Sequence, residues 1–64
     1  MPEIHVFMAA GRPPEVKQKL MKTISEAVVA TLGTDEENVT VQIVEAPLTD
    51  KMKGGKTFVE RMKK

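Results

Sequence analysis

The sequence predicts a small α+β domain: a single βαβ unit of two parallel strands and one long helix, followed by a short C-terminal hairpin and completed by oligomerisation. Apolar residues alternate with a period of two in residues 3–8 and 39–45, which is typical of strands. Between these segments they recur at spacings of three and four, which is typical of a helix. Because the chain has only 64 residues, we expect a single domain over residues 1–64 with a thin core of its own.

The first alternating segment has two faces of different character. Ile4, Val6 and Met8 lie on one face. The other face carries His5 and Phe7, and the phenylalanine indicates that this face is also partly covered, by another subunit. We interpret His5 as structural, or buried between subunits, rather than catalytic.

The helix is predicted to begin at Pro14, because proline suits the first helical position, where its missing N–H would have been unpaired. Gly33 is predicted to end the helix in the left-handed conformation. The helix then has about 18 residues and is about 27 Å long. Its apolar stripe consists of Val16, Leu20, Ile24, Ala27, Val28 and Leu32.

After the helix, Thr34 and Glu37 have the Thr-x-x-Glu spacing of a capping box, which predicts a short helical turn. In the strand that follows, Val39, Val41 and Ile43 are predicted to point inward. Because a strand, a helix and a strand follow one another in so short a chain, we expect parallel strands with a right-handed crossover.

The last part of the chain is predicted to be a loop, a hairpin and a tail. Pro47 ends the second strand, residues 48–53 form the loop, and Gly54-Gly55 is a turn signal for a small hairpin. The internal methionines are expected to fill gaps in the core. The basic residues of this part are interpreted as a solvated end that can help to draw in an anionic substrate: Lys51, Lys53, Lys56, Arg61, Lys63 and Lys64.

Such a unit is not stable alone, because it leaves one sheet face and both strand edges open. Chains of this size usually add disulfides, a metal or an oligomer. The chain has no cysteine, so disulfides are excluded, and its single histidine gives no basis for a metal site. We therefore expect no metal and predict self-association.

The composition also excludes several classes of partner. A net charge of +1 and an aromatic content of 3% give no case for binding nucleic acid. No apolar run approaches the roughly 18 residues of a membrane span. Because the sequence has no cysteine and shows no export leader, we expect a cytoplasmic protein.

Pro2 is the first candidate for chemistry. Initiator methionine is generally removed before a small residue, and loss of Met1 would expose the secondary amine of Pro2. An ordinary α-amino group has a pKa of about 7.7–8.0, and burial in an apolar site beside cations lowers it. A base poised near neutral pH suits proton abstraction beside a carbonyl. The alternative is that Met-Pro is a start without catalytic meaning; if Met1 remains, the Pro2 nitrogen is an amide without useful basicity.

Arg12 is the second candidate. It lies at the predicted junction of strand and helix, close to helical N–H groups that attract anions. Its planar guanidinium can bind a substrate carboxylate through two hydrogen bonds. The alternative is a solvated loop arginine.

Residues 2–12, which run from the proline through an alternating strand to Gly-Arg, resemble the opening of 4-oxalocrotonate tautomerases. The helix, the second strand and the Gly54-Gly55 pair also fall at the family's places, so the resemblance covers essentially the whole chain. It implies a tautomerase-like fold in homohexamers, built as trimers of dimers, without metal or organic cofactor. It further implies that the Pro2 nitrogen moves a proton between the oxygen of a dienol and a carbon, and that Arg12 binds a substrate carboxylate.

The parent activity of that family converts 2-hydroxymuconate to its 2-oxo isomer during aromatic compound degradation. The resemblance therefore implies an isomerase that interconverts enol and keto forms of a small unsaturated 2-oxo or 2-hydroxy acid. Two departures bear on the substrate: Thr40 stands where the parents have a second arginine, and Lys51-Met52-Lys53 stands where they offer an aromatic residue. Lys51 or Lys53 is a candidate replacement for the missing charge. Two alternatives stay open, a hydratase or dehalogenase that uses the same proline and a non-catalytic oligomeric binding module.

Overall fold

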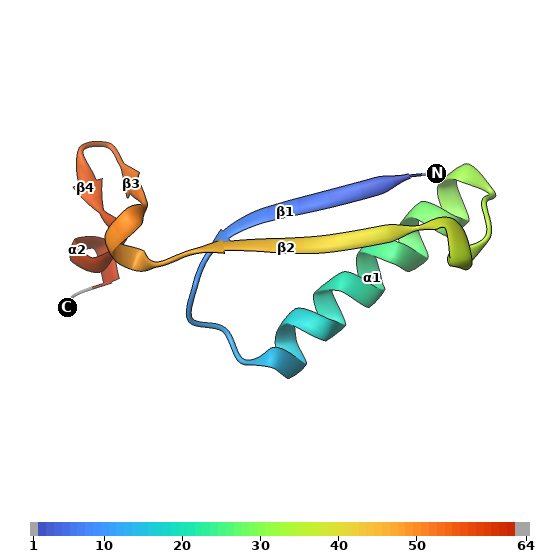
Figure 1. The fold of residues 1–64 in the computed structure, drawn as a ribbon, viewed down its shortest axis with the longest axis horizontal. Helices are drawn as coiled ribbons and strands as arrows, with labels where there is room; N and C mark the ends of the chain where they lie inside the picture. The colour runs from blue at the N-terminus through green and yellow to red at the C-terminus, as the bar shows by residue number, and fades with distance from the viewer. Residues whose placement is uncertain (1, 63–64) are drawn as a thin grey trace.

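The computed structural model describes residues 2–62 (Figure 1). Met1, Lys63 and Lys64 lie outside the described residues, as do the expectations placed on them. The elements are β1 (Glu3–Ala9), α1 (Pro14–Leu32), a 3-10 turn (Glu36–Asn38), β2 (Thr40–Ala46), a second 3-10 turn (Leu48–Asp50), β3 (Met52–Lys53), β4 (Lys56–Thr57) and α2 (Phe58–Met62).

Strands β1 and β2 pair in parallel over their full lengths, from Glu3 opposite Thr40 to Ala9 opposite Ala46. Since α1 connects them, the predicted βαβ unit is confirmed. Both strands end one residue later than the alternation predicts. The reason is that the hydrogen-bond ladder continues beyond the alternating segment: the Ala10 N–H donates to the Ala46 carbonyl at 2.9 Å.

Helix α1 lies along β2 and covers one face of the strand pair (Figure 1). Its start at Pro14 and its end are confirmed, because Gly33 adopts φ 71° and its N–H donates to the Val29 carbonyl at 2.9 Å. The short helical turn predicted after the helix is confirmed at Glu36–Asn38, but its predicted capping box is wrong. The turn there is capped by Asp35, in an extended conformation and without a side-chain hydrogen bond.

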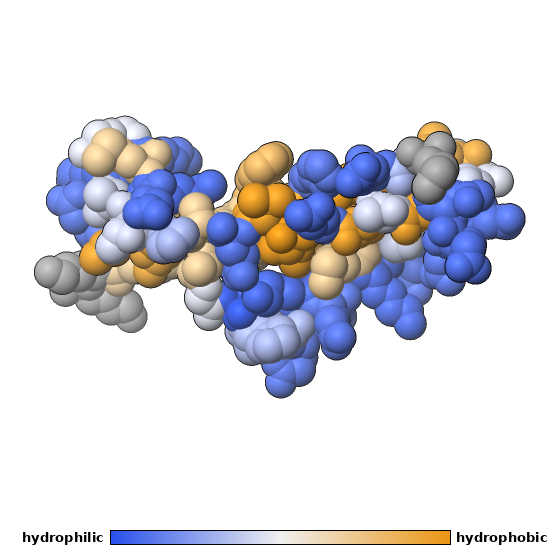
Figure 2. Space-filling view, in the orientation of Figure 1, coloured by the Kyte–Doolittle hydropathy of each residue, from blue (hydrophilic) through white to orange (hydrophobic). Residues whose placement is uncertain are grey.

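The other face of the strand pair is open, and Phe7 on it is 69% exposed. Within residues 2–62, Ala9 is the one buried apolar side chain. Figure 2 shows apolar residues reaching the surface along the strand pair. The Cα radius of gyration is 14.7 Å, whereas a compact chain of this length has about 11 Å. The chain therefore does not enclose a core of its own.

The C-terminal part, β3, β4 and α2, extends beyond the end of β2 (Figure 1). The predicted hairpin at Gly54-Gly55 is confirmed, with φ values of 63° and 80°. The tail that follows is a short helix, which the sequence interpretation missed. A capping box starts it, since the Thr57 N–H donates to Glu60 Oε1 at 3.0 Å and the Glu60 N–H donates to Thr57 Oγ1 at 3.3 Å.

Two methionines of this part do not fill a core. Met52 is 61% exposed and Met62 is 59% exposed, whereas Met8 and Met21 are partly buried, so the expectation of core filling does not extend to the first two. The hairpin is instead held by polar contacts, because Arg61 Nε and Nη2 donate to the Lys53 carbonyl at 3.0 and 2.9 Å. No helix in the described part of the chain has both the length and the apolar character needed to cross a membrane.

Candidate functional site

Pro2 lies directly before β1, at the amino end of the strand pair, and is half-buried. Its carbonyl accepts a hydrogen bond from the Thr40 N–H at 3.1 Å, so the first rung of the parallel ladder fixes its backbone. Thr40, the position of the missing family arginine, is therefore a direct neighbour of Pro2 within the same chain. Its side chain supplies a hydroxyl where an arginine would supply a cation.

Arg12 lies at the opposite end of β1, in the loop between Ala9 and Pro14, and is exposed. Gly11 adopts φ 132°, a conformation that L residues rarely adopt, and so turns the chain away from the strand. Pro13 caps α1 with an extended backbone, φ −68° and ψ 156°. Arg12 thus stands next to the N-terminus of α1, as predicted, where free N–H groups favour an anion.

One chain does not bring Pro2 and Arg12 together. The seven residues of β1 separate them, which at about 3.3 Å per residue is roughly 23 Å. A small substrate does not span that length. A site that uses both residues must therefore take Pro2 from one chain and Arg12 from another.

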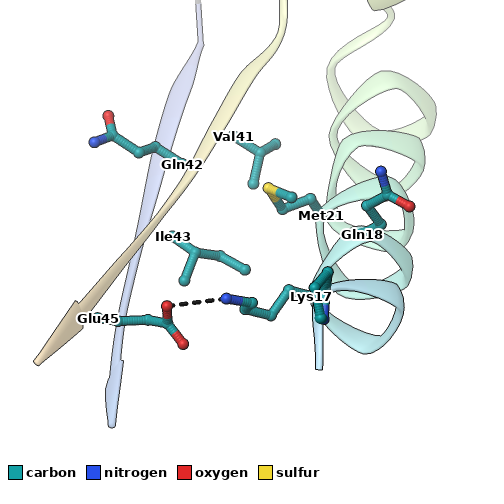
Figure 3. A pocket seen from close by; sticks show the side chains of 8 residues that line it. Lys17, Gln18, Met21, Val41, Gln42, Ile43 and Glu45 are labelled. Atoms are coloured by element: carbon teal, nitrogen blue, oxygen red, sulfur yellow. Dashed lines mark hydrogen bonds and ion pairs between the residues drawn. The ribbon is translucent and has the colours of Figure 1, made fainter. Parts of the chain in front are cut away.

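An ion pair lies close to the end of the strand pair where Arg12 is found. Lys17 Nζ donates to Glu45 Oε1 at 2.9 Å, and this pair joins α1 to β2 (Figure 3). The two side chains are 24% and 27% exposed. A cavity of about 340 Å³ lies beside the pair, and its lining residues are Pro14, Lys17, Gln18, Met21, Val41, Gln42, Ile43 and Glu45.

The sequence interpretation missed this pair. Its signal was Glu45 itself, a carboxylate on the face where Val41 and Ile43 point toward the helix. A charge at an inward position of an alternating strand indicates a partner across the core. Only the fold identifies that partner as Lys17, which is 28 residues away in the sequence.

His5 lies on the open face of the sheet and makes two contacts there. Its Nε2 is 2.8 Å from Glu3 Oε2, and its ring meets Phe7 edge-on at 6.5 Å between centroids. The structural interpretation of His5 agrees with these contacts. Glu3, the acidic side chain next in sequence to Pro2, is thereby engaged with His5.

The two candidate replacement cations lie at the far end of the chain from Pro2. Lys51 Nζ lies over the Phe58 ring, 5.8 Å from its centroid, and the Lys53 carbonyl is the acceptor for Arg61. Both belong to the C-terminal part, beyond the end of β2 (Figure 1). Neither reaches Pro2 of its own chain. Among residues 2–62 there is also no cluster of three or more His, Asp or Glu side chains able to hold a metal ion.

The chain is similar to known proteins along most of its length. A family model described as "Tautomerase enzyme" matches residues 2–50. A probable tautomerase of Bradyrhizobium diazoefficiens is 59% identical over 61 residues, which cover 95% of this chain and 91% of that protein. A 2-hydroxymuconate tautomerase of Bacillus subtilis is 42% identical over 45 residues, which cover 70% of this chain and 73% of that protein. The solved structure of a heterohexamer 4-oxalocrotonate tautomerase from Chloroflexus aurantiacus has a TM-score of 0.87 and 30% identity, and covers 94% of this chain and 97% of that chain.

Proposed function

The chain belongs to the 4-oxalocrotonate tautomerase family and is an isomerase, and on this premise we propose that it interconverts the enol and keto forms of a small unsaturated 2-oxo acid similar to 2-hydroxymuconate. The observation that carries the proposal is the position of Pro2, half-buried and held in the ladder at the exposed start of β1. The 2-hydroxymuconate tautomerase of Bacillus subtilis supports the substrate class.

Pro2 acts as the general base in this proposal. With Met1 removed, its neutral amine takes the proton from the enol oxygen, and the O–H electrons form the carbonyl. The conjugated double bonds shift, and the protonated amine returns the proton to a carbon of the substrate. The protein groups are unchanged at the end of the cycle, so no cofactor is needed. A hydratase also needs an acid or base to activate water, and the nearby Glu3 is engaged with His5.

Arg12 of a neighbouring chain binds the substrate carboxylate in this proposal. The requirement for a neighbour follows from the length of β1, which keeps the two residues of one chain apart. We propose that the neighbours come from a homohexamer, a trimer of dimers, in which the open sheet face is covered. The exposed Phe7 and the heterohexameric relative support this assembly.

The N-terminus provides the test of the proposed base. Protein processed to Pro2 should catalyse ketonisation of 2-hydroxymuconate or phenylenolpyruvate, and its activity should fall on acidification as the amine becomes protonated. Protein that retains Met1 should be nearly inactive although folded, because the lone pair of an amide nitrogen is committed to resonance. Intact mass identifies the two forms, and circular dichroism establishes that both are folded. Full activity with Met1 retained would refute the proline mechanism.

A further inference from the structure

We propose that the ion pair between Lys17 and Glu45 positions Arg12 for carboxylate binding, an inference that rests on the proposed function. The pair joins the first turns of α1 to the carboxyl end of β2 (Figure 3). Lys17 and Glu45 act through Arg12 and do not touch the substrate.

The side chain of Arg12 is not held by its own contacts. It is exposed, and within residues 2–62 it makes no side-chain hydrogen bond or ion pair. Its position depends on the backbone of its loop. On the strand side that loop is tied to the sheet by the Ala10 N–H, which donates to the Ala46 carbonyl at 2.9 Å.

On the helix side, the loop is rigidly connected to the start of α1. Pro13 and Pro14 come directly after Arg12, and their rings restrict the backbone. The Pro13 carbonyl accepts from the Val16 N–H at 3.1 Å and from the Lys17 N–H at 3.3 Å, so the first helical turn continues this rigid segment. A shift of the helix start relative to the sheet therefore moves Arg12 with it.

Apolar packing does not fix the helix start. The space between the first turns of α1 and β2 contains the cavity of about 340 Å³, and Val16, the first residue of the apolar stripe, is 48% exposed. What spans the space is the Lys17–Glu45 pair, whose partly buried side chains are less screened than a surface pair. In the described part of the chain it is the one ion pair that joins α1 to the sheet.

Glu45 also lies next to the strand-side tie of the loop. It directly precedes Ala46, whose carbonyl accepts from Ala10. The two ends of the Arg12 loop are thus attached to adjacent residues of β2, the helix side through Glu45 and the strand side through Ala46. Because each charge of the pair already has its partner at 2.9 Å, the cavity beside it offers no free charge to a ligand of its own.

The test is a double-mutant cycle with Arg12. Lys17→Met should lower kcat/KM for phenylenolpyruvate by about ten- to a hundredfold, mainly through KM, since a displacement of about 1 Å can cost that much. In the Arg12→Ala background the same change should have less than about a twofold effect, because no guanidinium is left to misplace. The reversed pair, Lys17→Glu with Glu45→Lys, should recover most of the lost activity.

Lys19→Met is the matched control, because Lys19 is exposed on the same helix and has no side-chain partner among residues 2–62. It removes the same charge and should leave kcat/KM within about twofold. Losses from Lys17→Met that are equal with and without Arg12 would show a purely structural role and overturn the inference. If Arg12→Ala lowers activity and Lys17→Met does not, the inference alone fails. If Arg12→Ala has no effect, the proposed carboxylate site fails, and the inference falls with it.

Discussion

The two ends of the parallel strand pair differ in what they offer a substrate. The amino end holds Pro2 and Thr40, joined through their backbones, and Thr40 offers a neutral hydroxyl there. The carboxyl end carries Arg12 at a helix N-terminus, with the Lys17–Glu45 pair beside it. The proposed base and the proposed anion-binding group are thus separated by the length of β1. The difference teaches that, under the proposed mechanism, a complete site needs two chains, each contributing the end that the other lacks.

Subunit complementation tests most directly whether the two ends come from different chains, and it has the largest expected effect. Protein that retains Met1 and the Arg12→Ala variant should each be nearly inactive alone. After joint unfolding and refolding in equal amounts, about a quarter of the sites should combine an intact Pro2 with an intact Arg12, if the chains mix at random. The ketonisation rate of the mixture should therefore rise to about that fraction of the wild-type rate.

The control for complementation is the same pair of proteins mixed without unfolding, which should stay inactive if the assembly exchanges chains slowly. Sedimentation velocity should find about six chains per particle in every sample. No recovery of activity in particles shown by mass to contain both chains would mean that one chain supplies both residues, and the comparison of the two ends would fail.

The next prediction changes the amino end alone. Thr40→Arg places a cation beside Pro2, where the oxygen that gains charge during proton transfer needs a donor. Loss of one such preorganised donor typically costs about 10²–10³ in rate, so a gain of about tenfold or more toward 2-hydroxymuconate is expected. Steady-state kinetics measure this gain, and Thr40→Gln is the uncharged control. An unchanged rate in a folded assembly would show that another residue already stabilises that oxygen.

The smallest expected effect comes from a glycine at each end. Gly11 precedes Arg12 and Gly33 ends α1 at the Pro2 end; both have positive φ and open space where a Cβ would lie. Alanine should destabilise by about 1–2 kcal/mol at Gly33, which has a left-handed helical φ of 71°, and by about 1–3 kcal/mol at Gly11, whose φ of 132° is more unusual. Only Gly11→Ala should also raise KM for a carboxylated substrate, by a few fold, because it disturbs the Arg12 loop. Thermal melts measure the loss of stability in each variant, and steady-state kinetics measure its KM. Equal KM values for Gly11→Ala and Gly33→Ala would show that Gly11 does not affect Arg12.

Much of the fold could be predicted from the sequence, because periodicity and terminal glycine carry strong signals. The alternating strands, the start of α1 at Pro14 and its end at Gly33 all follow from local chemistry. The capping-box spacing at Thr34 predicted the short turn that follows but not its cap, and the same spacing was overlooked at Thr57, where it starts α2. A spacing of three residues specifies a cap only when the backbone presents its free N–H groups.

The candidate site was less accessible to sequence reasoning. Pro2 and Arg12 each have a local signal, and the structure places both at the ends of β1. The proposal that different chains supply them depends on the length and direction of β1. The Lys17–Glu45 pair needs both the parallel register and the placement of α1 over β2 before it can be recognised. Long-range pairing of this kind leaves no periodic trace in the sequence.

The open sheet face with Phe7 has a consequence for how this protein changes by mutation. In the proposed homohexamer, a single altered codon at this face appears in every chain at once, so that its effect on assembly is repeated at each symmetry-related contact. The face is therefore under a stricter constraint than its exposure in one chain suggests. By contrast, after a gene duplication two different chains can share one assembly. One chain can then change at the Pro2 end of its strand pair while the other chain keeps that end intact.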